Sequence, residues 1–119
     1  MTIDMGHKVS ELDSLHSLDR LYRIIAARKN QSTDQSYTAQ LLAAGIEKPV
    51  RKLSEETTEV IIEALGGNKQ ALCRESADLL YHLLVVWAAC DLQPEAVWQE
   101  LESRRHQSGL AEKASRPKP

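Results

Sequence analysis

Two groups of acidic residues carry the clearest chemistry in this sequence. The first is Glu55-Glu56-x-x-Glu59 and the second is Glu75-x-x-Asp78. Acidic groups three or four residues apart lie on one face of a helix, about 5–6 Å apart between Cβ atoms, and repel each other by about 0.2–0.5 kcal/mol per pair. A hard divalent cation offsets such repulsion, and in phosphate chemistry that ion is usually Mg²⁺, bound by carboxylates, waters and substrate phosphates. The pattern favours a Mg²⁺ site, and the alternative is a pair of solvated helix faces.

The first acidic group is predicted to lie on a two-faced helix at about 49–65. A count of about 100° per residue places Glu56, Glu59 and Lys52 on one stripe, with Glu55 less well aligned. The opposite stripe is expected to face the core, and its members are Val50, Leu53, Thr57, Val60, Ile61 and Ala64. The carboxylates therefore share one face of this helix.

The second acidic pair lies on a segment, 69–89, that is apolar on nearly every side. A helix of that kind is buried all round. We therefore expect Asp78, and with it Glu75, in a partly buried setting, where an unpaired carboxylate is costly. Gly66-Gly67 separates the two segments and predicts an antiparallel turn that brings both acidic groups to facing stripes. This combination favours a shared cation site over two solvated faces.

The fold class is predicted to be all-α, because no segment shows the sustained period-two alternation of a strand. Boundary residues such as Ser, Asn, Gly and Pro divide the chain into helices at about 17–29, 37–44, 49–65, 69–89 and 94–105. A helix as apolar as 69–89 needs more cover than one short chain provides, so we expect a helical bundle whose core is completed by homodimerisation.

The 119-residue chain is predicted to form one domain. Residues 17–105 are the expected helical domain. They are flanked by a polar, flexible lead-in at 1–16 and a loosely ordered tail at 106–119.

The composition argues against nucleic acid as a partner. The formal net charge is −2, the isoelectric point is near 6.1, and Phe is absent. Nucleic-acid-binding domains usually have an isoelectric point above about 9 and clustered Lys and Arg. We expect a small-molecule partner instead.

The sequence also argues against a membrane protein. The N-terminus has no apolar signal region, and the longest apolar run, 79–90, contains His82 and is shorter than the roughly 20 residues of a membrane span. We expect a soluble cytoplasmic protein. Cys73 and Cys90 lie in apolar helical sequence and are expected to be buried free thiols, with a disulfide as the alternative.

The acidic pattern and four longer stretches resemble a known family. The pattern resembles the all-α nucleotide pyrophosphohydrolase (MazG-like) superfamily, and the stretches narrow the resemblance to the phosphoribosyl-ATP pyrophosphohydrolase family of histidine biosynthesis. These stretches are SYTAQLL at 36–42, KLSEETTEV at 52–60, ESADLLYHLLV at 75–85 and VWQEL at 97–101. The resemblance runs from about residue 18 to residue 105. Ser54 departs from the pattern, since many relatives have Gly there.

The resemblance implies hydrolysis of the α–β phosphoanhydride of phosphoribosyl-ATP, which gives phosphoribosyl-AMP and pyrophosphate. It implies Mg²⁺ as cofactor, with four carboxylate ligands, Glu56, Glu59, Glu75 and Asp78. Glu55 is implied to act in catalysis by orienting the attacking water, or else to complete the shell of a second metal.

Four further residues are candidates for the site. Lys52 either contacts a substrate phosphate or pairs with Glu56 one turn on. Arg28 either reaches the ribose phosphate or complements a helix dipole. Tyr37 either contacts the nucleotide or packs its own helix, and His82 either orients a ligand carboxylate or is a hydrogen-bonded interior histidine.

Three other functions remain possible from the sequence. One is a housecleaning (d)NTP pyrophosphatase on the same scaffold, and another is a noncatalytic helical dimerisation module. A di-iron carboxylate bundle is the third, but it requires two Glu-x-x-His pairs. Only Asp78 and His82 come near that pattern, at the wrong spacing.

Overall fold

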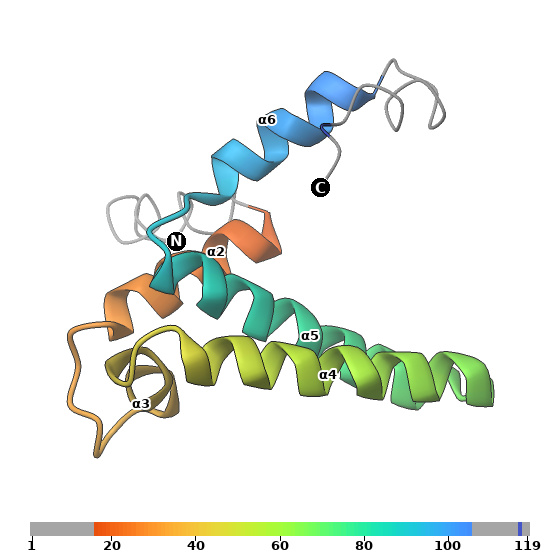
Figure 1. The fold of residues 1–119 in the computed structure, drawn as a ribbon, viewed down its shortest axis with the longest axis horizontal. Coiled ribbons are helices and arrows are strands. Elements are labelled where there is room, and N and C mark those ends of the chain that lie inside the picture. Colours follow the sequence, from red (N-terminus) through yellow and green to blue (C-terminus); the bar gives the residue numbers. More distant parts are fainter. Residues whose placement is uncertain (1–15, 106–116, 118–119) are drawn as a thin grey trace, which may run out of the picture.

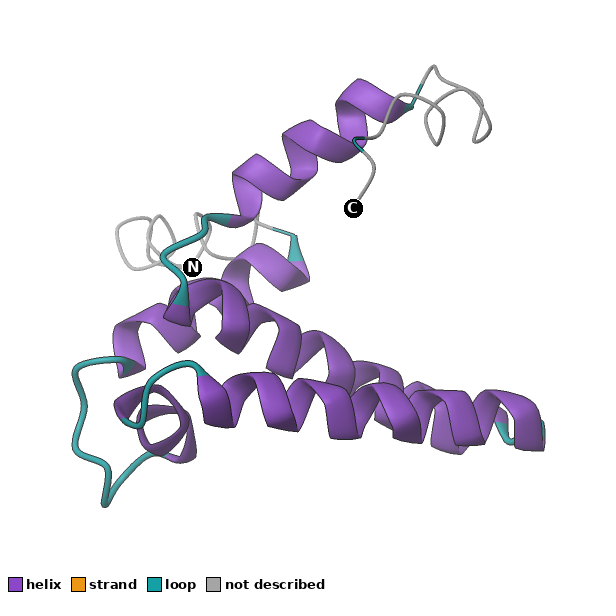
Figure 2. Cartoon of the chain, in the orientation of Figure 1, coloured by secondary structure: helices purple, strands orange, loops and turns teal. Residues whose placement is uncertain are grey.

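The computed structural model describes residues 16–105 and residue 117, and this part of the chain is helical. The elements are α2 (Ser17–Arg28), α3 (Tyr37–Ala43), α4 (Glu47–Gly66), α5 (Lys69–Ala89) and α6 (Pro94–Arg104). No strand occurs among the described residues (Figure 2). The predicted all-α fold class is confirmed. All but the last residue of the lead-in expected at 1–16 and most of the tail expected at 106–119 lie outside the described residues, and the single-domain boundaries stay a prediction.

The two longest helices, α4 and α5, form an antiparallel hairpin (Figure 1). Helices α2 and α3 gather at the end of the hairpin away from its turn, and α6 leads off from the end of α5. The turn forms because Gly67 takes a left-handed backbone with φ of 73°, which suits glycine. It lets the Asn68 N–H donate to the Glu63 carbonyl at 3.3 Å.

Short-range capping bonds set the starts of α3 and α5 at the predicted positions. The Ser36 side chain accepts a hydrogen bond from the Ala39 N–H, and the Asn68 side chain accepts one from the Ala71 N–H. Such bonds satisfy N–H groups that a helix start leaves unpaired. Helix α4 begins at Glu47, two residues earlier than predicted, and Pro49 is tolerated in the first turn because no helical partner is needed there.

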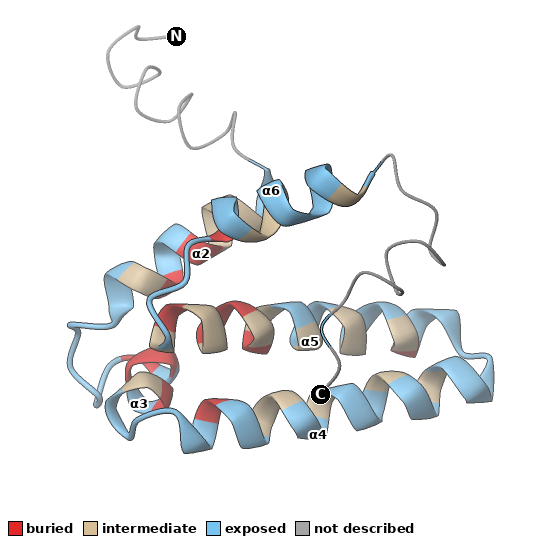
Figure 3. Cartoon of the chain, turned by 45° about the horizontal axis from the view of Figure 1, so that its top comes forward, coloured by how far each residue is buried: buried red, intermediate tan, exposed pale blue. Residues whose placement is uncertain are grey.

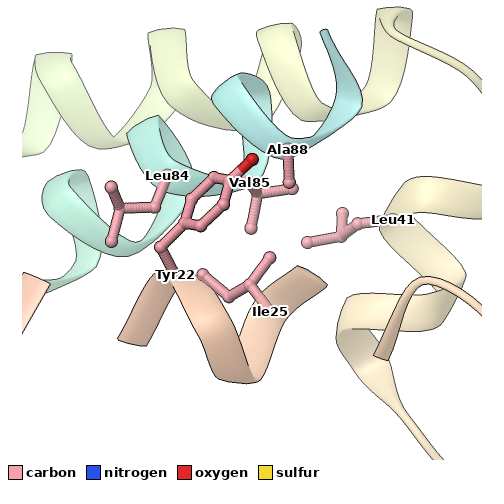
Figure 4. Close-up of a cluster of buried hydrophobic side chains, with 6 residues drawn as sticks. All are labelled: Tyr22, Ile25, Leu41, Leu84, Val85 and Ala88. Atoms are coloured by element: carbon pink, nitrogen blue, oxygen red, sulfur yellow. The ribbon is translucent and has the colours of Figure 1, made fainter. Parts of the chain in front are cut away.

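The hydrophobic core lies where α2, α3 and α5 meet (Figure 4). Its buried members are Tyr22 and Ile25 of α2, Leu41 of α3, and Leu84, Val85 and Ala88 of α5. Full burial of one such large side chain contributes about 1.5–3 kcal/mol. This cluster fixes α2 and α3 against the C-terminal half of α5.

The rest of the hairpin is covered on fewer sides, which corrects two predictions. The stripe of α4 expected in the core is largely open: Val50 and Ile61 are exposed, and so is nearby Leu65, at 86% (Figure 3). Helix α5 is not buried all round, since Leu80 is exposed. A count of apolar residues predicts how many faces a helix can bury, but the described chain supplies neighbours for only some of them.

Cys73 and Cys90 also differ from expectation. Both are free, as predicted, but both are exposed rather than buried. Apolar neighbours in the sequence indicated burial, whereas Cys73 lies on an uncovered side of α5 and Cys90 caps its C-terminal end. No helix in the described part of the chain is long and apolar enough to cross a membrane.

Candidate active site

Three carboxylates meet across the α4–α5 hairpin. Glu56 of α4 and Glu75 and Asp78 of α5 each offer an oxygen that lies within 4.8 Å of the others. Glu56 and Glu75 are half-buried, but Asp78 is exposed, so the partly buried setting predicted for it is wrong. The antiparallel turn brings the two acidic groups together as the sequence predicted, while the ligand role of each residue stays a prediction. We call these three residues the carboxylate cluster.

The carboxylate cluster concentrates negative charge. Partial burial raises the pKa of Glu75, and the charges of Asp78, Glu56 and Glu59 raise it further. A hydrogen bond between the carboxyl groups of Glu75 and Glu56 acts in the same direction. Two carboxyl groups that share a site favour holding one proton between them. A bound cation would replace that proton.

The donor set of the cluster fits Mg²⁺. All three side chains offer carboxylate oxygens, the donors that a hard cation prefers, and Mg²⁺ is commonly held by few carboxylates while waters and phosphates complete its shell. Oxygens on opposite sides of one Mg²⁺ lie about 4.2 Å apart. Oxygens on adjacent positions lie about 3 Å apart, so the three side chains would have to draw together to share one ion.

The other two acids of the first group lie outside this triad of ligand atoms. Glu59 is exposed, and its negative charge helps to raise the pKa of Glu75. Glu55 is exposed and forms an ion pair with Lys52, in which Lys52 Nζ lies 3.1 Å from Glu55 Oε2. Lys52 therefore pairs with Glu55, three residues on, and the alternative that it pairs with Glu56 is wrong. The hydrogen bond to Glu55, the nearby Tyr37 hydroxyl and the Glu55 charge raise the pKa of Lys52.

His82 follows the cluster by one turn of α5 and is buried, with 6% of its surface exposed. Its Nδ1 is buried and has no hydrogen-bond partner, so the alternative of a hydrogen-bonded interior histidine is wrong for this atom. Burial lowers the pKa of His82, and the charge of Lys52 lowers it further. The imidazole is therefore held in its neutral form.

Tyr37, at the first position of α3, reaches the same place. Its ring lies edge-on to the His82 ring, with centroids 6.4 Å apart. The ring of Tyr81 lies edge-on to His82 at 4.9 Å. The Tyr81 hydroxyl is hydrogen-bonded to the buried Thr38 hydroxyl. Sequence reasoning missed this bond between α3 and α5, since no local pattern joins partners 43 residues apart.

Arg28 is not brought to the cluster. It is exposed in the last turn of α2, and α2 packs against Leu84, Val85 and Ala88 of α5. Those residues lie six to ten positions beyond Asp78, or about 9–15 Å along the helix. Arg28 could therefore contact only a part of the substrate that extends well beyond the cluster, toward α2.

Comparisons with known proteins match the sequence to one family. The family model described as phosphoribosyl-ATP pyrophosphohydrolase matches residues 18–105. Three curated proteins named phosphoribosyl-ATP pyrophosphatase illustrate the similarity. The Azospirillum brasilense protein is 50% identical over 83% of this chain and 89% of its own length. The Trichlorobacter lovleyi protein is 52% identical, over 85% and 94% respectively. The Agrobacterium fabrum protein is 50% identical, over 89% and 99%. The chain belongs to the phosphoribosyl-ATP pyrophosphohydrolase family.

Proposed function

We propose that this protein hydrolyses the α–β phosphoanhydride of phosphoribosyl-ATP, giving phosphoribosyl-AMP and pyrophosphate in L-histidine biosynthesis. The observation that carries the proposal is the carboxylate cluster, found in a chain about half identical to proteins named phosphoribosyl-ATP pyrophosphatase. Such a cluster suits a reaction whose main demand is alignment and neutralisation of phosphate charge.

Glu56, Glu75 and Asp78 would hold Mg²⁺, with Glu59 as an outer or additional ligand. When bound, the ion supplies charge neutralisation and a template for the phosphate oxygens. The raised pKa of Glu75 supports this assignment, since the cluster without a cation is short of positive charge.

Lys52 and Glu55 are assigned as the catalytic pair beside the cluster. Lys52 Nζ is a compact, mobile point charge that suits a phosphate oxygen. When Lys52 turns to the phosphate, Glu55 loses its ion-pair partner. The freed carboxylate can then accept a proton from the attacking water, which is the role of a general base.

The working form is proposed to be a homodimer. Support comes from the exposed apolar residues on the hairpin, which include Ile61, Ile62, Leu65 and Leu80. A second copy of the chain would cover them and complete the core. Dilution should then lower the specific activity, and a monomer with full activity would contradict the dimer.

The direct test is pyrophosphate release from phosphoribosyl-ATP with and without Mg²⁺. We expect release that depends on Mg²⁺ and exceeds that from dUTP and dCTP. Faster release from dUTP or dCTP would indicate a housecleaning hydrolase. No release from any of the three, with no change in thermal stability on adding Mg²⁺, would indicate a noncatalytic module.

A further inference from the structure

The buried imidazole of His82 presents an unused hydrogen-bonding atom beside the carboxylate cluster. A buried polar atom without a partner is costly, because its desolvation is not repaid. Nδ1 of His82 is such an atom, and it is the one buried side-chain nitrogen or oxygen without a partner among the described residues. A ligand group that bonded Nδ1 would remove this cost.

The surroundings of His82 indicate which part of a ligand that group belongs to. His82 of α5 lies close to both α3 and α4. Its ring lies edge-on to that of Tyr37 in α3, and the charges of Lys52 in α4 and Asp78 in α5 shift its pKa. The acidic side of this junction suits a cation and phosphates. The side toward α3 carries an aromatic ring and a neutral imidazole, which suit an uncharged group.

Tyr37 has the exposure expected of a stacking surface. Half of its surface, 49%, is open to solvent, although its ring already touches His82. An aromatic ring exposed in this way can stack on any nucleobase, because every base has a π-face. Nδ1 is buried, so a ligand reaches it only after a neighbouring side chain shifts. Of the two tyrosines whose rings lie edge-on to His82, Tyr37 is the exposed one and has room to shift.

The other side of His82 is fixed. The ring of Tyr81 lies edge-on to it, and the hydrogen bond between the Tyr81 and Thr38 hydroxyls ties that ring to α3. His82 therefore has one rigid neighbour and one movable neighbour. Such an arrangement holds the imidazole in place while the Tyr37 side opens.

We propose that Tyr37 and His82 form the subsite for the nucleoside of the substrate, with the base stacked on Tyr37 and a polar group of the nucleoside bonded to His82 Nδ1. The proposal rests on the proposed function for the identity of the substrate. With this subsite, phosphoribosyl-ATP binds with its adenosine toward α3, and the pyrophosphate leaves from the side of the carboxylate cluster.

Calorimetric titration with AMP and with inorganic pyrophosphate plus Mg²⁺ separates the two ends of the substrate. In Tyr37→Ala, AMP affinity should fall by about tenfold, which is the order expected for one lost base stack. Pyrophosphate affinity should change by less than about twofold, because its proposed ligands are untouched. Tyr37→Phe keeps the ring and should bind AMP nearly as the wild type does.

His82 is tested by a matched pair of substitutions. The amide of Asn lies close to the position of Nδ1, so His82→Asn should retain most AMP affinity, whereas His82→Leu should lower it by about three- to tenfold. Leu fills the space with apolar atoms, and circular dichroism with a thermal scan checks that the fold survives. His16→Asn, at the exposed cap of α2, is the control for a histidine outside the site.

Three results would overturn the subsite. They are equal losses of AMP and pyrophosphate binding in Tyr37→Ala, unchanged AMP binding in both Tyr37→Ala and His82→Leu, and absence of AMP binding to the wild type. Failure of the proposed function is recognised separately, as no pyrophosphate release from phosphoribosyl-ATP, and the titrations still decide the subsite in that case.

Discussion

The two ends of the α4–α5 hairpin differ in how well the chain covers them. At the end near α2 and α3, Ile25, Leu84 and Val85 are almost completely buried. At the Gly66-Gly67 end, Ile62 and Leu65 are 53% and 86% exposed. Both ends are apolar in sequence, so the difference comes from the neighbours that α2 and α3 supply at one end only. The carboxylate cluster lies between the covered end and the open end, where a site can be partly desolvated and still admit a substrate.

Removing one carboxylate should have the largest effect on function with little effect on the fold. Glu56→Gln and Asp78→Asn each replace a proposed Mg²⁺ ligand by a neutral amide of similar shape. We expect each to lower Mg²⁺-dependent pyrophosphate release by about a hundredfold or more, since even residues that only support metal ligands commonly contribute 10–100-fold. Pyrophosphate release with phosphoribosyl-ATP measures the loss.

Glu47→Gln is the control for this test, because Glu47 is an exposed acid in the first turn of α4. It should keep nearly full activity. Circular dichroism should show unchanged helical content in all three variants. Near-normal turnover in Glu56→Gln or Asp78→Asn would contradict the metal assignment.

Core truncations should separate the two ends by stability. Leu41→Ala and Leu84→Ala at the covered end should each lower the free energy of unfolding by about 2–5 kcal/mol, the usual cost of such a cavity. In dilute monomer, Leu65→Ala at the open end should change it by less than about 0.5 kcal/mol. Urea unfolding followed by circular dichroism gives the comparison. A large loss in monomeric Leu65→Ala would mean that the open end is covered within one chain.

A charge at the open end should weaken association if a second copy covers it. Ile62→Asp places a carboxylate in the proposed contact, and we expect the dissociation constant of the dimer to rise by at least about tenfold. Sedimentation velocity over a range of concentrations measures it. Lys48→Asp changes an exposed residue near the start of α4 and serves as the control. Equal association of wild type and Ile62→Asp would place the dimer contact elsewhere.

The features that sequence reasoning predicted well depend on local rules. The starts of α3 and α5 followed from caps at Ser36 and Asn68, whose partners are three residues away. The meeting of the two acidic groups followed from helical periodicity and a Gly-Gly turn. In each case the deciding interaction lies within one or two turns of helix or at a recognisable break.

Most of the features that sequence reasoning missed depend on which segments, distant in sequence, pack against each other. Exposure of Cys73 and the Thr38–Tyr81 bond are set by packing between distant segments. Lys52 is a different case, because its partner Glu55 is only three residues away and helical spacing allows pairing with either Glu55 or Glu56. Apolar content alone does not fix any of these.

The smallest effect that we expect is a gain in stability when charge is removed from the cluster. The raised pKa of Glu75 means that the folded state binds this proton more tightly than the unfolded state does. Stability without a cation therefore falls as the pH rises above the ordinary carboxyl value of 4.5 and through the raised pKa.

At pH 7 in the presence of a chelator, Glu75→Gln should melt a few degrees higher than the wild type. The gap should close as the pH is lowered, because protonation then neutralises Glu75 in the wild type, and added Mg²⁺ should stabilise the wild type more than the variant. Scanning calorimetry at pH 5 and pH 7, with and without Mg²⁺, measures all three differences. A lower melting temperature for Glu75→Gln under chelation would show that Glu75 stabilises the hairpin by itself and that the cluster carries no excess charge for a cation to offset.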